Sequence, residues 1–231
     1  VSRFIKDNLA SRHMDYEGPE FDQGGPWGFR HQINMADSGI GSRAPRVAND
    51  RAGEVGRMLD VKDFDLDRIF GSEGVQIVHL SGLIGALSPE TGRFCLEIAR
   101  AARKHGTRIS FDLNHRASFW ENREKELHEI FTEIASVSDI LIGNEEDLQM
   151  GLGVKGPDVE KKSKLDTSVF FEMIAEVNRD FPDVKAVATT LREVETANRH
   201  QWGAVVWCDG QRAISPTCEL GVIDRIGGGD G

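Results

Sequence analysis

The chain has 231 residues, enough to bury a full hydrophobic core within one domain. Apolar residues make up 39% of the sequence and charged residues 29%, as in an ordinary globular protein. A formal net charge of −10 argues against nucleic acid and anionic membranes as partners, and no apolar run approaches the length of a membrane span. Cys95, Cys208 and Cys218 have no metal-like spacing, so we expect reduced thiols in a cytoplasmic protein.

The amino-terminal stretch does not have the pattern of a secretory signal. Residues 2–13 place Phe4, Ile5 and Leu9 on one face and predict an amphipathic helix. No strand pattern precedes this helix, and the sequence stops one residue after Asp230. We therefore expect the fold to be cut at both ends.

Residues 15–53 differ from the rest of the chain. They hold seven glycines and three prolines with little periodicity, which predicts loops and two strands, near residues 28–35 and 46–49. A polar segment of this length in a compact domain commonly serves a function, for example as a lid. Its arginines could approach an acidic substrate, although a solvated surface is the simpler role for any one of them: Arg30, Arg43, Arg46 and Arg51.

Strands and helices alternate from residue 75 onward. The predicted strands cover residues 75–80, 107–113, 139–143 and 184–190, and a hairpin of residues 202–208 and 211–215 turns at Asp209-Gly210. The predicted helices cover residues 89–105, 121–136 and 168–181, with a further helix opening at Asn144. Ser88 and Pro89 suit the start of the first of these helices and Gly106 its end. This alternation predicts right-handed crossovers and a mostly parallel sheet, which is an α/β fold.

Ligands of such sheets bind at the carboxyl ends of the strands. Polar residues follow the four strands predicted between residues 75 and 190 and also close the chain: Ser81, Asn114-His115-Arg116, Asn144 to Asp147, Arg192-Glu193 and Asp230. Because all five stretches carry polar residues suited to ligands, a binding site is favoured over polar residues scattered on the surface.

The most distinctive of these stretches is the run Gly227, Gly228 and Gly229, followed by Asp230. Consecutive glycines can turn several backbone N–H groups toward one anion, such as a phosphoryl oxygen. An aspartate beside them could take a proton from an attacking hydroxyl. The alternative is a glycine-rich surface turn or linker at the end of the chain.

Two further strand ends suit charged ligands. The Arg116 guanidinium could bind a carboxylate or phosphate in a bidentate manner, and the alternative is a surface pair with Asp112. Asn144 and Asp147 lie three residues apart and could hold a hydrated Mg²⁺, and the alternative is an ordinary helix cap. The seven histidines show no metal spacing, and the sequence has neither a Walker A loop nor a Ser/His/Asp signature.

In this order the motifs resemble those of the ribokinase-like (PfkB) carbohydrate kinases, and most of all their 2-dehydro-3-deoxygluconate (KDG) kinases. Residues 224–230, DRIGGGD, are similar to the family's D-T-x-G-A-G-D signature. Residues 111–116, with Trp120 soon after, are similar to its F-D-x-N-x-R…W stretch. Residues 144–147 resemble its N-x-x-E motif, and residues 189–193 resemble a T-L-R-E strand end near ATP.

The resemblance implies a three-layer α/β/α, Rossmann-like fold with a small β lid. The kinase core would comprise residues 1–14 and 54–231, and residues 15–53 would form the substrate-covering lid. It also implies an ATP-dependent kinase that phosphorylates the terminal hydroxyl of a sugar acid, with KDG preferred. The alternatives are another sugar kinase of the family, of the fructokinase or ribokinase type, and a non-catalytic sugar-binding regulatory homologue.

The resemblance further implies a role for each matching residue. Asp230 would bind the sugar and deprotonate its hydroxyl, and the N–H groups of Gly227, Gly228 and Gly229 would stabilise the transferred phosphoryl group, with Gly228 also contacting the nucleotide. Arg116 and Asn114 would contact the substrate or the ATP phosphates. Thr190 and Arg192 would lie along the nucleotide. Asn144 and Asp147 would organise Mg²⁺ through water. A homodimer through the lid would follow from the family's habit of pairing lid strands.

Three features depart from the family pattern. The family's first strand with its sugar-binding glycines would precede residue 1, and the helices that shape the adenine pocket would follow residue 231. Arg192 stands where many members have glycine, and Asp147 replaces a glutamate.

Overall fold

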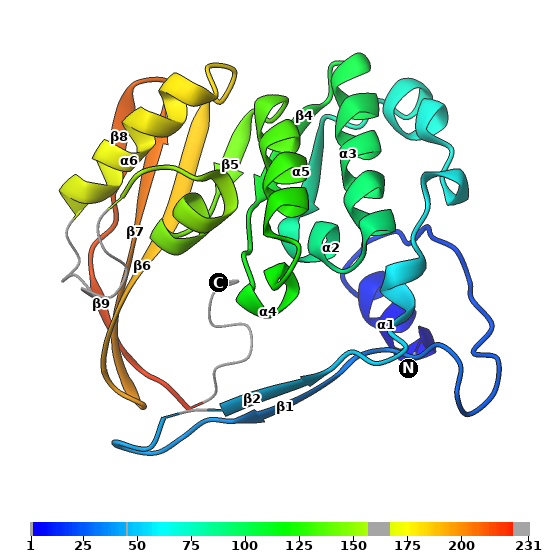
Figure 1. Ribbon diagram of the computed structural model, residues 1–231, viewed down its shortest axis with the longest axis horizontal. Helices are drawn as coiled ribbons and strands as arrows, with labels where there is room; N and C mark the ends of the chain where they lie inside the picture. The colour runs from blue at the N-terminus through cyan, green and yellow to red at the C-terminus, as the bar shows by residue number, and fades with distance from the viewer. Residues whose placement is uncertain (1, 45, 157–166, 224–231) are drawn as a thin grey trace.

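The computed structural model describes residues 2–44, 46–156 and 167–223 of the protein (Figure 1). Its main element is a sheet with the strand order β3-β4-β5-β6-β7-β8, in which β9 also pairs with β7. The strands β3 to β6 are parallel, whereas β7 pairs antiparallel with β6, β8 and β9. The prediction of a mostly parallel sheet is therefore correct only for the half of the sheet that contains β3 to β6. The bounds of these strands are Ile77–Ser81 (β3), Arg108–Asp112 (β4), Ile140–Ile142 (β5), Ala186–Thr196 (β6), Arg199–Cys208 (β7), Gln211–Ile214 (β8) and Cys218–Gly221 (β9).

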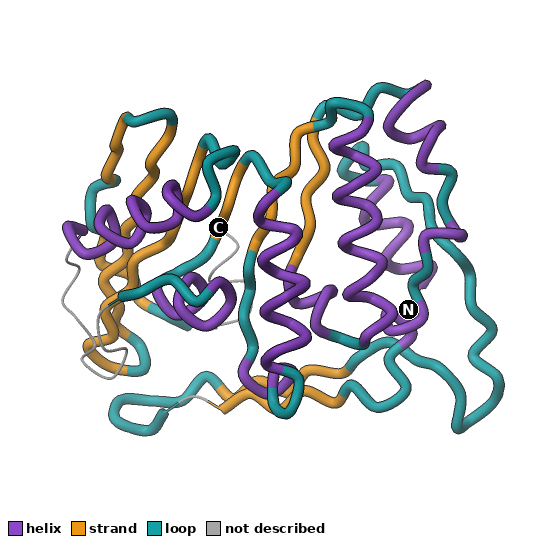
Figure 2. The backbone as a smooth tube through the Cα atoms, turned by 45° about the horizontal axis from the view of Figure 1, so that its top comes forward, coloured by secondary structure: helices purple, strands orange, loops and turns teal. Residues whose placement is uncertain are grey.

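The longer helices α3, α5 and α6 pack along one face of this sheet, as the two views agree (Figures 1 and 2). The α-helices are α1 (Ser2–Ala10), α2 (Gly82–Ala86), α3 (Pro89–Lys104), α4 (Ala117–Trp120), α5 (Glu124–Ser136) and α6 (Thr167–Asp180). Four short 3₁₀ or π elements complete the described chain: η1 (Val55–Met58), η2 (Val61–Asp63), η3 (Asp67–Ser72) and η4 (Asp147–Gly151). None of the described helices combines the length and the apolarity that a bilayer crossing requires.

The centre of the sheet is a row of apolar side chains from three adjacent strands. Phe111 of β4 lies beside Leu141 of β5, which lies beside Val187 of β6, and all three are fully buried. Phe131 of α5 packs against Phe111 with its ring edge-on at 5.3 Å between centroids. Strands buried on both faces read as continuous apolar runs, which is why these segments were recognisable in the sequence.

Local chemistry explains where α3 begins and ends. The Ser88 hydroxyl accepts a hydrogen bond from the Thr91 N–H, and the Thr91 hydroxyl oxygen accepts one from the Ser88 N–H. Pro89 occupies the first helical turn, where no N–H is needed. Gly106 adopts φ +76° just past the last turn, a conformation that glycine reaches without strain. The predicted cap, start and stop of this helix are confirmed.

The predicted helix over residues 121–136 is shorter in the structure and is preceded by a separate turn. α4 ends at Trp120, and α5 begins at Glu124 after Asn122, which adopts φ +64°. A residue in the left-handed region interrupts a right-handed helix. α2 follows β3 directly and is not among the predicted helices.

β6 extends well beyond the strand predicted over residues 184–190. Its pairing with β5 ends at Ala188, but its antiparallel pairing with β7 continues to Thr196. The T-L-R-E motif at residues 189–193 therefore lies inside a long β-hairpin, and its placement at a strand end was wrong. Leu191 stays buried while the neighbours on either side are exposed, which is the alternation that a half-buried strand requires.

A separate two-stranded ribbon, β1 (Ile33–Asp37) and β2 (Arg46–Asp50), leaves the body of the protein between α1 and η1. Figure 1 shows it running below the carboxyl ends of β3 and β4, with α4 above it. Nearly all of its side chains are exposed. The first strand of this segment begins five residues later than predicted and ends two residues later. The division into a core and a lid stays a prediction.

Candidate functional site

The carboxyl ends of β3, β4 and β5 meet at one edge of the sheet. Ser81, the last residue of β3, pairs with Asp112, the last residue of β4, and Asp112 pairs with Ile142 at the end of β5. The loops that follow these strands begin at Leu113 and Gly143. The polar residues predicted to follow these three strands are therefore brought together.

Asn114 forms a small polar cluster with Ser81 and Asp112. Its amide nitrogen donates to an Asp112 carboxylate oxygen at 3.2 Å and lies 3.5 Å from the Ser81 hydroxyl. Its amide oxygen is buried and has no partner within the described chain, and its backbone adopts φ +41°. A strained backbone and an unpartnered buried acceptor are features that concentrate at binding sites. Burial raises the pKa of the Asp112 carboxyl, and the nearby Asp147 carboxylate raises it further.

Asp147 joins the loops that follow β4 and β5. One carboxylate oxygen accepts from the His115 N–H at 2.9 Å, and the other accepts from the Asn144 N–H at 2.9 Å. The Asn144 amide oxygen in turn accepts from the Asp147 N–H at 2.9 Å. This reciprocal arrangement is a capping box, which was the alternative to a metal site for these two residues. Burial of Asp147 raises its pKa despite these hydrogen bonds.

The fit of this pair to Mg²⁺ can be judged from the same hydrogen bonds. Both Asp147 oxygens and the Asn144 amide oxygen already accept backbone N–H groups, so direct coordination would compete with the cap. Each oxygen keeps a second lone pair, which suits a bond to a water of a hydrated ion. No group of three or more His, Cys, Asp or Glu side chains suited to a metal occurs in the described part of the chain.

Arg116 carries an exposed guanidinium at this edge. Its Nη1 donates to the His115 carbonyl oxygen at 2.8 Å, which fixes the side chain beside its own loop. Within residues 2–44, 46–156 and 167–223 the guanidinium makes no ion pair with a carboxylate. The alternative pair with Asp112 is not formed, because the Asp112 carboxylate accepts from Asn114 instead.

His115 is a structural residue, as expected for the histidines of this chain. Its buried ring packs on Trp120 at 4.9 Å between centroids, and Trp120 packs edge-on against Phe131. Burial lowers the pKa of the imidazole and so favours its neutral form. This stack anchors the Arg116 loop to the hydrophobic core.

Thr190 and Arg192 lie on β6 beyond the parallel part of the sheet. They are two residues apart and both exposed, so they share one face of the strand. The Arg192 guanidinium lies over the Trp202 ring of β7, 5.8 Å from its centroid. The two residues continue the polar edge from Asn144 onto the hairpin, although as strand residues and not as a loop.

The arginines of the segment 15–53 are mostly paired with acids that the sequence analysis did not single out. Arg30 binds both oxygens of Asp50 at 2.8 Å, and Arg43 pairs with Asp37. Arg51 binds both oxygens of the buried Glu54, at 2.7 and 2.8 Å, and lies over the Phe119 ring of α4. These pairs reduce what the segment can offer to an acidic substrate and leave Arg116 as the better candidate. The i, i+3 spacing of Arg51 and Glu54 is the signal that could have revealed their pair.

The glycine run Gly227 to Gly229 and Asp230 lie outside the described residues. The proposed catalytic positions are therefore not placed by the structure, and their roles stay predictions. Val222 is the last described residue with a backbone hydrogen bond before this run, and it donates to the Asn198 carbonyl oxygen at 2.8 Å.

The fold of the chain is similar to that of solved carbohydrate kinases. A 2-dehydro-3-deoxygluconokinase from Thermotoga maritima superposes with a TM-score of 0.77 at 30% identity, over 88% of this chain and 58% of that one. A PfkB family carbohydrate kinase from Listeria grayi superposes with a TM-score of 0.79 at 21% identity, over 99% of this chain and 65% of that one. The chain has the ribokinase-like fold of the PfkB carbohydrate kinases. The α/β/α fold class and the family resemblance inferred from the motifs are confirmed.

A sequence relative points the same way. A 5-dehydro-2-deoxygluconokinase from Clostridium perfringens is 34% identical over 116 residues, which cover 49% of this chain and 33% of the relative. The chain thus matches about a third of that relative's length and 58% of the Thermotoga kinase. No family model matches the sequence.

Proposed function

We propose that the protein is an ATP-dependent sugar kinase. It transfers the γ-phosphoryl group of ATP to the terminal hydroxyl of a sugar acid. The observation that carries the proposal is the edge at the carboxyl ends of β3 to β5, where Arg116 presents a cation without an ion pair in the described chain. Anionic substrates of α/β sheets bind at this edge. Two relatives with at least 30% identity are named 5-dehydro-2-deoxygluconokinase and 2-dehydro-3-deoxygluconokinase.

In this proposal Asp230 removes the proton from the sugar hydroxyl while that oxygen attacks the γ-phosphorus. The N–H groups of Gly227, Gly228 and Gly229 stabilise the negative charge that builds on the transferred phosphoryl oxygens. The proton passes to Asp230, and the bond between the γ-phosphorus and the bridging oxygen of ATP breaks to release ADP. These roles rest on the motif at residues 224–230, which is similar to the family signature.

Arg116 would neutralise the substrate carboxylate or a phosphate, because a guanidinium can form two parallel hydrogen bonds to either group. Asn114 would supply its unpartnered amide oxygen to a donor on the substrate, such as a sugar hydroxyl. Its backbone conformation holds this oxygen at the end of β4. Thr190 and Arg192, on the same face of β6, would lie along the nucleotide.

Mg²⁺, when bound, would reduce the negative charge of the ATP phosphates. Asn144 and Asp147 would hold waters of the hydrated ion through lone pairs that the capping box leaves unused. In this proposal Asn144 and Asp147 both shape the loop after β5 and orient the waters of the hydrated ion.

KDG is our preferred substrate, phosphorylated on its terminal hydroxyl. Other sugar kinases of the family remain the second candidate, of the fructokinase or ribokinase type, and a non-catalytic sugar-binding homologue is the third. We further propose a cytoplasmic location and a homodimer formed through the exposed β1–β2 ribbon, whose strand edges carry no partner strand in the described chain.

A coupled ADP-release assay separates these candidates. The product of the complete gene is incubated with ATP, Mg²⁺ and, in parallel, KDG, fructose and ribose. ADP release that depends on KDG supports the proposal, and preference for fructose or ribose supports the second candidate. Binding of a sugar without any ADP release would leave only the third.

A further inference from the structure

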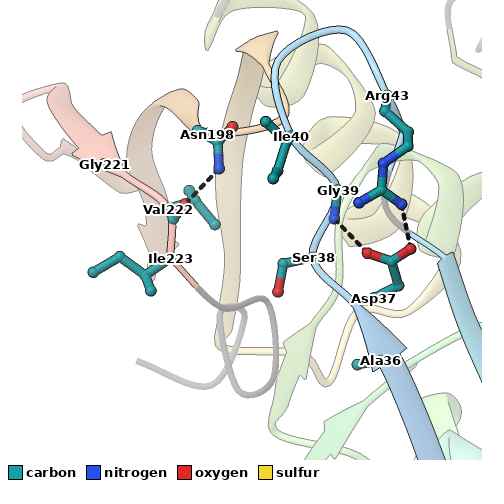
Figure 3. A pocket seen from close by; sticks show the side chains of 10 residues that line it. All are labelled: Ala36, Asp37, Ser38, Gly39, Ile40, Arg43, Asn198, Gly221, Val222 and Ile223. Carbon is teal, nitrogen blue, oxygen red and sulfur yellow. Dashed lines mark hydrogen bonds and ion pairs between the residues drawn. The ribbon is translucent and has the colours of Figure 1, made fainter.

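The tip of the β1–β2 ribbon contacts the turn of the β6–β7 hairpin, which lies more than 150 residues away in the sequence. The Gly41 carbonyl oxygen accepts from the Ala197 N–H at 3.1 Å. The Gly41 N–H donates to the Asn198 side-chain oxygen at 3.0 Å. Figure 3 shows Asn198 between the ribbon tip and the last described residues of the chain.

Asn198 also binds Val222, the residue that follows β9. Its side-chain nitrogen donates to the Val222 carbonyl oxygen at 3.2 Å, and its backbone carbonyl oxygen accepts from the Val222 N–H at 2.8 Å. One side chain thus links three segments: the ribbon tip, the hairpin turn, and the strand that leads in sequence toward Asp230. An amide is the group that this position requires, because it accepts from one backbone and donates to the other.

The ribbon tip is shaped for this contact. Gly39 and Gly41 adopt φ +72° and +57°, which non-glycine residues rarely adopt. The Arg43–Asp37 ion pair and the Gly39 N–H, which donates to Asp37 at 3.1 Å, hold the turn together, as Figure 3 shows. Beneath the tip lies an open hollow of about 790 Å³, bounded by Ile40, Asn198 and Ile223 among others.

The ribbon is anchored at its base as well. Arg51, just after β2, lies over the Phe119 ring of α4, 5.2 Å from its centroid. The ribbon therefore runs from α4 at its base to the β6–β7 turn at its tip, below the carboxyl ends of β3 and β4 (Figure 1). At its base both strands of the ribbon continue into the body of the protein. Within the described chain the tip is held only by the contacts given above, so the tip is the end that can move away from the β6–β7 turn.

We propose that Asn198 is a positioning residue that latches the ribbon over the substrate edge. The inference rests on the proposed kinase function for its effect on catalysis, but the latch itself does not. A latched ribbon holds the sugar and keeps water from the γ-phosphate. An open ribbon lets the sugar escape and lets ATP hydrolyse without transfer.

Two variants at this position test the latch. Asn198→Ala removes both side-chain hydrogen bonds, whereas Asn198→Asp keeps the acceptor for Gly41 and loses the donor to Val222. Glu219→Gln is the matched control, because it removes the exposed Arg199–Glu219 pair between β7 and β9 without touching the ribbon. Amide hydrogen exchange of residues 38–43 is measured first, without substrates.

We expect exchange at Gly41 to become about tenfold faster in Asn198→Ala, the effect of losing a typical hydrogen bond, and to stay near wild type in Asn198→Asp and Glu219→Gln. In the ADP-release assay we expect Asn198→Ala to raise KM for the sugar about tenfold and to increase sugar-independent ATP hydrolysis. A merely destabilised protein would lose active enzyme and leave KM unchanged.

Unchanged exchange at Gly41 in Asn198→Ala would overturn the latch. Equal acceleration by Glu219→Gln would also overturn it, since the effect would then belong to the hairpin as a whole. Accelerated exchange together with a wild-type protein that releases no ADP with any sugar would keep the latch and reject the proposed function.

Discussion

The His115 N–H donates to the Asp147 carboxylate at 2.9 Å and so ties the loop after β4 to the loop after β5. The second oxygen of the same carboxylate holds the Asn144 N–H. Arg116, next to His115, therefore depends on Asp147 for its place at the sheet edge. Asp147, which we expected to organise a metal ion, thus also holds the two loops of the site in place.

Asp147→Asn should lower the free energy of unfolding. One oxygen can still accept a hydrogen bond, but the new NH₂ group would face a backbone N–H and leave a buried donor unpaired, which costs about 1–3 kcal/mol. Urea unfolding monitored by circular dichroism measures the change. Asp183→Asn, which removes only the exposed pair with Arg103, is the control and should change stability by less than about 0.5 kcal/mol. Equal stability of the two variants would show that the Asp147 bonds are not structural.

Asp112→Asn should stabilise the protein at neutral pH and lose this advantage in acid. Burial and the nearby Asp147 raise the folded-state pKa of Asp112 above its unfolded value, so the folded state binds the proton more tightly. The stability from this group is fully present below the unfolded pKa and is lost as pH rises through the folded one. Removing the charge should therefore help most at neutral pH. Unfolding curves of both proteins between about pH 4 and 7 test the sign, and an advantage that grows toward acid would contradict it.

Arg116→Ala should reduce kcat/KM for the sugar by at least about 100-fold, a loss of roughly 3 kcal/mol of binding to an anion in the transition state. Its stability should stay within about 0.5 kcal/mol of wild type, because the guanidinium is exposed and no ion pair is broken in the described chain. Arg93→Ala on α3, an exposed arginine away from the edge, is the control. An active Arg116→Ala enzyme would remove Arg116 from the site.

Asn114→Gly should be more stable than Asn114→Ala by about 1 kcal/mol. Asn114 adopts φ +41°, and alanine pays a steric penalty in this region that glycine does not. Both variants lose the amide that contacts Asp112, so the comparison isolates the backbone. Thermal unfolding of the two proteins measures the difference, and a more stable alanine variant would refute the claim of strain.

Much of the body of the fold could be predicted from local chemistry. Ser88 and Gly106 fixed the ends of α3, and Asp209-Gly210, with φ +46° and +84°, fixed the turn between β7 and β8. The edge residues were found because parallel strands bring their carboxyl ends together. These features depend on a few neighbouring residues, which the sequence displays directly.

The features that were missed depend on distant partners. The extension of β6 to Thr196 is stabilised by pairing with β7, so no signal near Leu191 marks where the strand ends. The Asn198 contact joins Gly41 across most of the chain. Asn144 and Asp147 were identified correctly as a pair, but their spacing alone could not distinguish a cap from a metal site.

The central claim is that the protein moves a phosphoryl group from ATP to a sugar acid. ³¹P NMR of the product of the complete gene, with ATP, Mg²⁺ and KDG, follows that transfer directly. We predict a new phosphomonoester resonance alongside ADP, and a rate lower by at least about 100-fold in Asp230→Asn. Formation of ADP and inorganic phosphate without a sugar phosphate, or an equal rate in Asp230→Asn, would contradict the account.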